Sequence, residues 1–168
     1  INLKNIKKRD KFYIIYRNKN NIDDFVDLFT FRKLCKLKSI KFYVANDMKL
    51  ATELKSDGIY LSAFNKSFKA LTFKKLKYDI IGSAHNIKEV INKEYQGCTK
   101  IFLSPIFKTK KNRSYLGVTK FNIIKLAAKK DIISLGGINS ENIRYLRICR
   151  VEGFASISWI KKNGPSIN

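Results

Sequence analysis

The sequence of 168 residues lacks several features that mark whole classes of protein. No apolar run approaches the roughly 20 residues needed to cross a bilayer, and no charged-then-apolar leader opens the chain. We therefore expect neither a membrane span nor an export signal. The cysteines Cys35, Cys98 and Cys149 are odd in number and widely spaced. They match neither a disulfide framework nor a metal-binding knuckle, which fits a location in the reducing cytoplasm.

Acidic residues are scarce: 13 Asp and Glu stand against 35 Lys and Arg, for a formal net charge of +22. Most of the positive charge is Lys, which is spread along the whole chain with abundant Asn and Ile. A nucleic-acid-binding domain more typically gathers basic residues on one element, with Arg and aromatic residues interleaved. The pattern favours a solvated basic surface that helps to draw in anionic substrates. Specific nucleic-acid binding is the minor alternative.

Nothing in the sequence divides the chain. It contains no linker, no low-complexity tract and no break in composition, and 168 residues suffice for one compact domain with a sizeable core. We expect a single domain over residues 1–168.

Short β-rich runs alternate with longer amphipathic segments. Strands separated by helices imply right-handed βαβ units and a parallel sheet. Asn86 followed by Glu89 predicts an N-cap with an acid at the third helical position. The predicted strands are Lys11–Tyr16, Lys41–Ala45, Gly58–Leu61, Asp79–Gly82, Lys100–Leu103, Asp131–Leu135 and Gly153–Ile157.

Such a sheet is either open and doubly wound or closed into an eight-stranded barrel. An open sheet would favour a glycine-rich loop after the first strand, but Tyr16-Arg17-Asn18-Lys19 contains no glycine. The best phosphate-binding segments instead follow the last two strands, as in a barrel. We predict the α/β class and a (β/α)8 TIM barrel. Because the sequence supplies seven strands, we expect the first strand to be missing from this chain.

Two consecutive strand ends predict a phosphate site. Gly136-Gly137 lets backbone N–H groups approach an anion closely, and a helix N-terminus beyond it would add positive charge. The next strand ends at Ile157-Ser158. The alternative is a plain tight turn beside an N-cap serine. Placement of both segments on neighbouring strands favours a phosphate cup.

Asn46-Asp47 closes a strand, and two interpretations of Asp47 stay open. A lone carboxylate there suits Mg²⁺, which takes one or two protein carboxylates plus substrate phosphates. Equally, Asp47 is a good N-cap for the helix that follows.

Cations and hydroxyls follow other strands. Arg17 and Lys19 alternate at a strand end, where they would clamp an anionic substrate. The loop 104–112 suits phosphate binding or a lid, although a merely solvated basic loop is the alternative. The single histidine, His85, has no Ser–His–acid set around it in the sequence, so we assign it a structural role.

In this order, these segments resemble the thiamine-phosphate synthase and thiazole tautomerase superfamily from about Tyr13 to Ile160. Tyr16-Arg17-Asn18-Lys19 looks like the family's Gln-Leu-Arg-Glu-Lys, and Asn46-Asp47 like its Asn-Asp pair. Ser56-Asp57-Gly58-Ile59-Tyr60-Leu61-Ser62 resembles Ala-Asp-Gly-Val-His-Leu-Gly, and Gly82-Ser83-Ala84-His85 its Ser-x-His segment. Ser104-Pro105-Ile106-Phe107-Lys108-Thr109 resembles Gly-Pro-Val-Phe-Pro-Thr. Tautomerases carry histidine where this chain has Pro105, so the resemblance favours the synthase branch.

The resemblance implies a transferase of thiamine biosynthesis that couples an aminopyrimidine pyrophosphate to a thiazole phosphate and releases pyrophosphate. It implies Mg²⁺ as cofactor and phosphorylated small molecules as substrates. The implied catalytic residues are Arg17, Lys19, Asn46 and Ser83. The implied substrate-binding residues are Thr109, Lys110, Lys111, Gly136, Gly137, Ile157 and Ser158, and the implied metal ligands are Asp47 and Asn65.

One departure bears on activity. Where the family carries a second Mg²⁺-binding aspartate, Ser62-Ala63-Phe64-Asn65 has no carboxylate. Asn65 offers a neutral oxygen, so Mg²⁺ should bind more weakly. The alternative function is therefore a catalytically impaired barrel of the same superfamily that binds a phosphorylated ligand.

Overall fold

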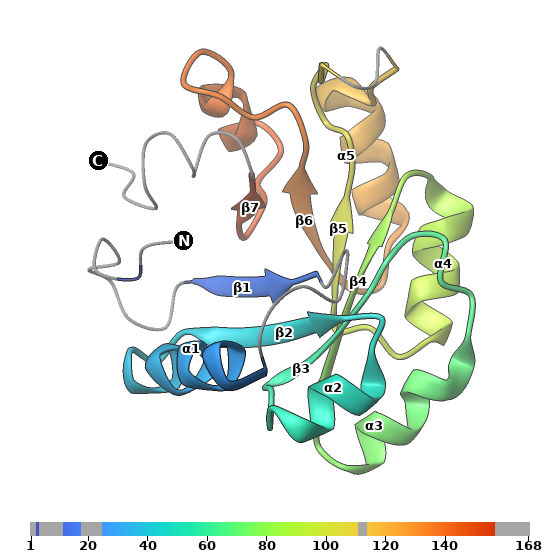
Figure 1. Cartoon of the computed structure of the whole chain (residues 1–168). Coiled ribbons are helices and arrows are strands. Elements are labelled where there is room, and N and C mark those ends of the chain that lie inside the picture. The colour runs from blue at the N-terminus through green and yellow to red at the C-terminus, as the bar shows by residue number, and fades with distance from the viewer. Residues whose placement is uncertain (1–2, 4–11, 18–24, 111–113, 157–168) are drawn as a thin grey trace.

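A computed structural model describes residues 3, 12–17, 25–110 and 114–156 of the chain. In these residues a parallel sheet curls round an interior, and each strand pairs with the next one along the sequence, in the order β1-β2-β3-β4-β5-β6-β7 (Figure 1). The strands are β1 (Tyr13–Tyr16), β2 (Lys41–Ala45), β3 (Gly58–Leu61), β4 (Asp79–Ala84), β5 (Lys100–Leu103), β6 (Asp131–Leu135) and β7 (Phe154–Ala155). The predicted barrel-type α/β fold is confirmed.

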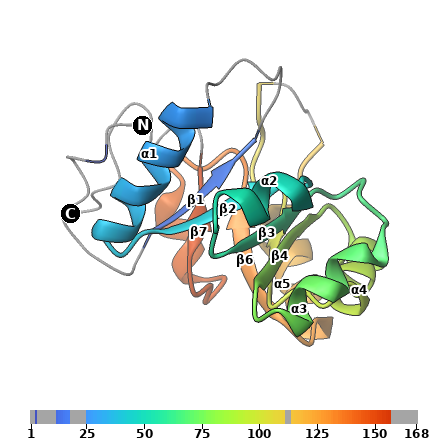
Figure 2. The ribbon, with the colours of Figure 1, turned by 60° about the horizontal axis from the view of Figure 1, so that its bottom comes forward.

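Helices connect the strands and lie on the outer side of the curl (Figures 1 and 2). They are α1 (Phe25–Leu37), α2 (Met48–Glu53), α3 (Leu71–Lys75), α4 (Ile87–Tyr95) and α5 (Gly117–Ala127), with short 3-10 helices η2 (Phe68–Ala70) and η3 (Ile143–Arg147). The predicted cap is confirmed: the Asn86 side chain accepts a hydrogen bond from the Glu89 amide at 3.0 Å. Among the described residues, no helix is long and apolar enough to cross a membrane.

The predicted strand bounds agree closely with the observed ones. Strands β2, β3, β5 and β6 have the predicted ends. Strand β4 continues to Ala84, because Ser83 and Ala84 pair with Phe102 and Leu103 of β5. Strand β1 begins at Tyr13, and β7 ends at Ala155 within the described residues. The local β-rich runs therefore predict the sheet well.

The two faces of the sheet bury different apolar groups. Strand residues that face the helices form the larger clusters, which include Ile59, Ile80 and Ile101. The opposite face fills the interior of the curl with Tyr43, Tyr60, Ile81, Phe102 and Ile133. Because side chains alternate along a strand, residues two positions beyond these also point inward. This alternation brings polar side chains to the carboxyl end of the interior.

A separate set of polar side chains lies at the amino ends of the strands. The Tyr43 hydroxyl donates to Asp79 at 2.8 Å, and burial raises the pKa of that hydroxyl, helped by the carboxylate. Nearby, the Lys100 ammonium lies 2.8 Å from Asp131 and 3.8 Å from Glu152. Polar groups at the amino ends of barrel strands typically contribute to stability rather than chemistry.

We expect Lys100→Met to lower the free energy of unfolding by about 0.5–1 kcal/mol, because the pair is partly exposed. The hydrogen bond from Lys100 holds the pKa of Asp131 below its usual 3.8. The stabilisation by Asp131 is therefore full above its unfolded pKa and is lost as the pH falls through the lower folded value. In urea unfolding at several pH values, the free energy of unfolding of the variant should fall less steeply at acid pH than that of the unmodified chain. An unchanged acid dependence would contradict this assignment.

Candidate functional site at the carboxyl ends of the strands

Three inward-facing serines line the carboxyl end of the interior. Ser62, Ser83 and Ser104 each stand two residues beyond an inner apolar residue, and they are 4%, 5% and 7% exposed. Their hydroxyls therefore line the interior and not the outer surface. Active sites of barrels of this kind lie at this end. The predicted site residue Ser83 is thus one of these three serines.

Arg17 lies just beyond β1 and reaches across to β3. Its Nη2 donates a hydrogen bond to the Tyr60 hydroxyl at 2.9 Å, and its guanidinium carbon lies 4.9 Å from the centre of the Tyr60 ring. Tyr60 is itself buried and packs against Phe102. Stacking on an aromatic face and one hydrogen bond fix the guanidinium while leaving further donors available for an anion. This arrangement suits the predicted clamp.

Asn46, Ser62 and Asn65 form one hydrogen-bonded cluster between two strand ends. The Asn46 Oδ1 atom accepts from the Ser62 amide and from Asn65 Nδ2, both at 3.0 Å, and Asn46 Nδ2 donates to Ser62 Oγ at 2.9 Å. Asn46 has a positive φ of 59°, which Asn tolerates better than most residues. The cluster brings the predicted residues Asn46 and Asn65 together, and it fixes the loop after β3 to the loop after β2.

Asp47 is the N-cap of α2, as one of the two open interpretations predicted. Its Oδ1 accepts a hydrogen bond from the Leu50 amide at 2.9 Å. A carboxylate has two oxygens, so capping through one of them is compatible with a metal on the other. Exposed Asp47 suits Mg²⁺, which completes its shell with water and substrate phosphate. The Asn65 amide oxygen accepts from the Ser67 amide at 2.9 Å and keeps one lone pair for a metal. Among the described residues, no group of three or more His, Cys, Asp or Glu side chains forms an all-protein cage.

His85 helps to hold the end of β5. Its Nδ1 lies 2.7 Å from the Ser104 carbonyl oxygen, which only accepts, so Nδ1 carries the proton. The His85 amide donates to the Glu89 carboxylate at 2.8 Å. A small cavity of about 200 Å³ lies beside this pair and is lined by His85, Ser104, Pro105, Ser114, Tyr115, Leu116 and Lys120. These contacts support the structural role assigned to His85.

The glycine pair after β6 makes close contact with the loop after β5. The Phe107 amide donates to the Gly136 carbonyl at 3.1 Å. Gly137 has a φ of +73°, and a β-carbon there would lie 2.4 Å from the Phe107 carbonyl oxygen. Only glycine therefore allows the two loops to touch. The contact places the segment containing Thr109 and Lys110 beside Gly136 and Gly137. The predicted phosphate cup also needs Ile157-Ser158, so it stays a prediction.

The helix expected directly after these glycines begins later than predicted. Asn139 starts a turn in which its Oδ1 accepts from the amides of Glu141 and Asn142, both at 3.0 Å. Asn142 in turn donates to the Gly137 carbonyl at 2.8 Å, and the short 3-10 helix η3 follows. The asparagine side chains satisfy backbone donors that a helix start would otherwise leave open. The prediction that a helix N-terminus adds positive charge next to the glycines is thus wrong.

Four predicted site residues, Lys19, Lys111, Ile157 and Ser158, lie outside the described residues. Sequence reasoning also missed two residues that the structure brings into the site. Tyr60 is the partner of Arg17, and Ser62 is part of the asparagine cluster. The available signal was strand alternation, because both residues share the inward face with Gly58 at the start of β3.

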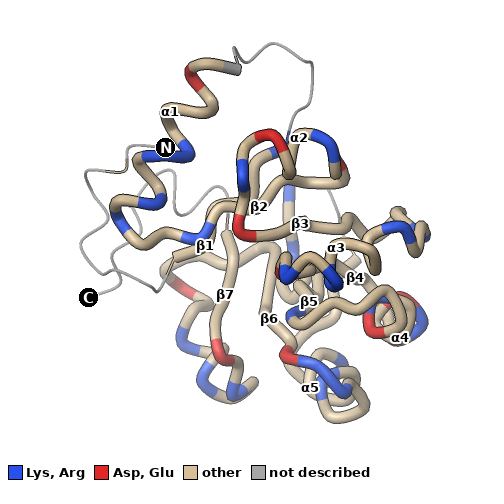
Figure 3. Tube along the Cα trace, turned by 90° about the horizontal axis from the view of Figure 1, so that it is seen from below, with Lys and Arg blue, Asp and Glu red and all other residues tan. Residues whose placement is uncertain are grey.

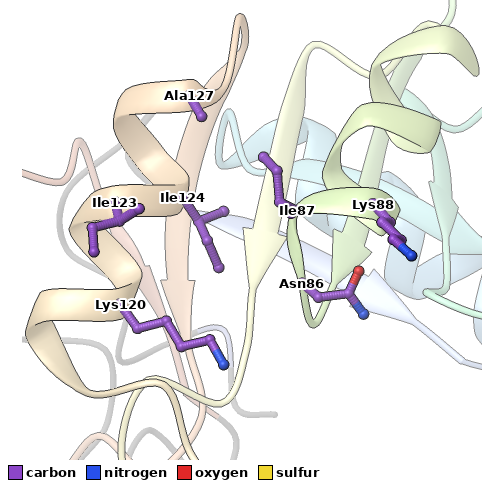
Figure 4. A pocket seen from close by; sticks show the side chains of 7 residues that line it. All are labelled: Asn86, Ile87, Lys88, Lys120, Ile123, Ile124 and Ala127. Atoms are coloured by element: carbon purple, nitrogen blue, oxygen red, sulfur yellow. The ribbon is translucent and has the colours of Figure 1, made fainter.

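Another cavity lies on a different part of the molecule. It measures about 620 Å³ and opens on the outer side of the sheet between α4 and α5, with Ile87 and Ile124 facing each other across it (Figure 4). Its lining is apolar apart from Asn86, Lys88 and Lys120. Its lining contains no acidic residue, so we do not assign the phosphate chemistry to it.

Basic residues do not gather on one element. Lys and Arg positions occur on each of the α-helices among the described residues, α1 to α5 (Figure 3). This spread agrees with the solvated basic surface that the sequence favours. The absence of a nucleic-acid partner stays a prediction.

The chain is similar in sequence to known proteins of one family. The family model described as thiamine monophosphate synthase matches residues 4–160. A thiamine-phosphate synthase from Prochlorococcus marinus is 32% identical over 132 residues, covering 76% of this chain and 38% of the relative. A second, from Methanococcus vannielii, is 29% identical over 133 residues, covering 77% of this chain and 64% of the relative. The chain thus spans less than two thirds of the length of either relative.

One solved structure shows the same fold. Thiamine phosphate pyrophosphorylase from Pyrococcus furiosus superposes with a TM-score of 0.73 at 22% sequence identity. The match covers 87% of this chain and 72% of that protein.

Proposed function

The chain belongs to the thiamine monophosphate synthase family, and on that premise we propose that it is a transferase joining an aminopyrimidine pyrophosphate to a thiazole phosphate. The observation that carries the proposal is the order of polar groups at the carboxyl ends of consecutive strands. Arg17 follows β1, Asn46-Asp47 follows β2, and Ser83 stands near the end of β4. The Gly136-Gly137 contact with the loop after β5 completes the series. This order supports a site in which an anion clamp and a phosphate cup would face one interior.

The proposed reaction breaks one bond and forms another. The bond between the pyrimidine methylene carbon and the pyrophosphate oxygen breaks, and its electron pair leaves with pyrophosphate. The thiazole nitrogen then uses its lone pair to form a carbon–nitrogen bond to the cationic methylene. No protein nucleophile is required, so the residues act by orientation and by stabilising charge.

Each described group has a defined part in this scheme. Arg17, held on the Tyr60 ring, donates to the departing pyrophosphate. Ser83 offers a hydroxyl to the pyrimidine from the interior wall, and Gly136 and Gly137 offer backbone N–H groups to the thiazole phosphate. Mg²⁺ held by Asp47 and the Asn65 amide oxygen would supply further positive charge to the leaving pyrophosphate.

The direct test is the formation of thiamine phosphate from both substrates by the purified chain during a Mg²⁺ titration into the millimolar range. Product that depends on Mg²⁺ and on both substrates is the expected result. A folded protein that forms no product at any Mg²⁺ concentration would overturn the proposal.

A second candidate function is binding of a phosphorylated ligand without turnover. The observation that favours it is the engagement of Asn65, whose Nδ2 donates to Asn46 and whose Oδ1 accepts from the Ser67 amide at 2.9 Å. A neutral side chain with both polar atoms in use is a weaker metal ligand than a carboxylate. Calorimetric binding of thiazole phosphate or pyrophosphate without product formation would establish this function.

We expect Asn65→Asp to lower the Mg²⁺ concentration needed for half-maximal activity by roughly tenfold, because a second carboxylate adds negative charge to the site. Without Mg²⁺ the variant should melt at a lower temperature than the unmodified chain. An aspartate cannot donate to Asn46 Oδ1, and it places two acceptor oxygens together.

Thermal unfolding with and without Mg²⁺ tests this independently of activity. Mg²⁺ should raise the melting temperature of the variant more than that of the unmodified chain. An equal Mg²⁺ effect on both proteins would remove Asn65 from the metal site.

A further inference from the structure

The loop that carries Asn65 is held from outside the sheet by a buried lysine. Lys93, on α4, is 0% exposed, and its Nζ donates to the Asn65 carbonyl at 2.6 Å and to Gln96 Oε1 at 2.7 Å. Gln96 is also 0% exposed, and its Nε2 donates to the carbonyls of Asn65 at 3.0 Å and Ser67 at 2.8 Å. Two buried side chains, one on α4 and one at its C-cap, thus donate three hydrogen bonds to one short loop.

The sheet makes room for this lysine. Gly82 lies in β4, and a β-carbon there would lie 2.9 Å from Lys93 Cδ and 2.9 Å from Cys98 Sγ. The aliphatic stem of Lys93 therefore crosses bare backbone on its way to the loop. A surface lysine needs no such passage, because its ammonium reaches water directly.

The hydrogen bonds continue from this loop into the site. The Asn65 backbone is fixed at its carbonyl by Lys93 and Gln96 and at its amide by the Ser62 carbonyl at 3.0 Å. The Asn65 side chain then donates to Asn46, next to the N-cap Asp47. One residue, Asn65, therefore links the buried ammonium to the predicted metal site.

We propose that Lys93 is a positioning residue that, with Gln96, holds the Asn65 loop so that Asn65 reaches Asn46 beside Asp47. The ammonium touches neither substrate nor metal; it acts through the Asn65 carbonyl. A buried ammonium on a helix holds the loop more rigidly than a solvent-exposed side chain would. Rigid contacts of this kind, made to the residues that carry metal ligands, orient those ligands around the metal. The part of this inference that concerns the metal rests on the proposed function.

Hydrogen exchange of the protein without ligands tests the support directly. Lys93→Met keeps the unbranched stem and removes the ammonium. We expect the amides of Asn65 and Ser67 to exchange roughly tenfold faster or more, because each donates within the loop and the lost hydrogen bond is charge-assisted. Lys88→Met is the matched control, because it removes an exposed ammonium from the same helix. It should leave those amides unchanged.

A second variant, Gln96→Met, keeps the test decisive if Lys93→Met fails to fold. It removes two donors to the loop and retains Lys93, so we expect a selective but smaller increase in the same exchange rates. If exchange in both variants is unchanged, or rises equally in β3, α4 and the loop, Lys93 only fills space and the inference is overturned.

Metal binding and kinetics test the link to the site. In Lys93→Met, we expect Mn²⁺ affinity, measured by water-proton relaxation, to fall roughly tenfold, with a lower kcat and an unchanged KM for thiazole phosphate. Loss of loop protection without any change in Mn²⁺ affinity or kcat would overturn the positioning role. If the unmodified chain neither binds Mn²⁺ nor forms product, the proposed function fails, and the exchange rates still decide whether Lys93 holds the loop.

Discussion

Asp47→Asn should lower Mg²⁺-dependent formation of thiamine phosphate by about a hundredfold or more, while the free energy of unfolding changes by less than about 0.5 kcal/mol. The effects on activity and on stability are separable because the Asp47 side chain both caps α2 and is the proposed Mg²⁺ ligand. As an N-cap, Asn accepts a hydrogen bond from the Leu50 amide as Asp does. As a metal ligand, the neutral amide lacks the charge that Mg²⁺ requires. A Mg²⁺ titration measures the loss of activity, and urea unfolding measures the change in the free energy of unfolding.

Asp47→Ala is the comparison that completes this test. It removes both the cap and the charge, so we expect the same loss of activity with an additional loss of about 1 kcal/mol in stability. Full activity in Asp47→Asn would leave Asp47 as a helix cap and nothing more. That result would also remove the main support for a metal at this end of the sheet.

Gly137→Ala should lower the free energy of unfolding by about 3 kcal/mol or more and abolish binding of thiazole phosphate. A β-carbon at this position would lie 2.4 Å from the Phe107 carbonyl oxygen and 2.6 Å from that of Lys108. The backbone φ of +73° adds strain for any residue with a β-carbon. The loop containing Thr109 must therefore move away from the glycines. Urea unfolding and calorimetric titration of the phosphate measure the two losses.

Gly117→Ala is a matched control for this variant. Gly117 also has a positive φ, of +68°, but a β-carbon there would meet no atom within 4 Å. We expect it to cost only the backbone strain, about 1 kcal/mol, with phosphate binding retained. Equal losses for the two variants would show that strain, and not the contact between the loops, explains the effect at Gly137.

Much of the fold was predictable because its signals are local. The strands β2, β3, β5 and β6 are short β-rich runs whose ends coincide with the observed ones. The cap at Asn86 depends on residues three positions apart. Local spacing also identified Asn46-Asp47 and Gly136-Gly137, because turn chemistry restricts which residues close a strand.

The supports of the site were not predictable in the same way. The Arg17–Tyr60 pair joins residues 43 positions apart, and it depends on the register of three strands. Lys93 resembles the many surface lysines of this chain, and only the bare backbone of Gly82 allows its stem to be buried. A periodic pattern reports which face of a helix is apolar, but it does not report that a charged side chain crosses that face.

The order of the strands has a consequence for synthesis on the ribosome. Because each described strand pairs with the next one in sequence, the sheet can grow as the polypeptide emerges. Arg17 meets Tyr60 once β3 has left the exit tunnel, and Lys93 can reach Asn65 once α4 follows. The glycines after β6 come last among these parts. A nascent chain would therefore complete the part of its site around Arg17 and Asn65 before the glycine loop after β6 exists.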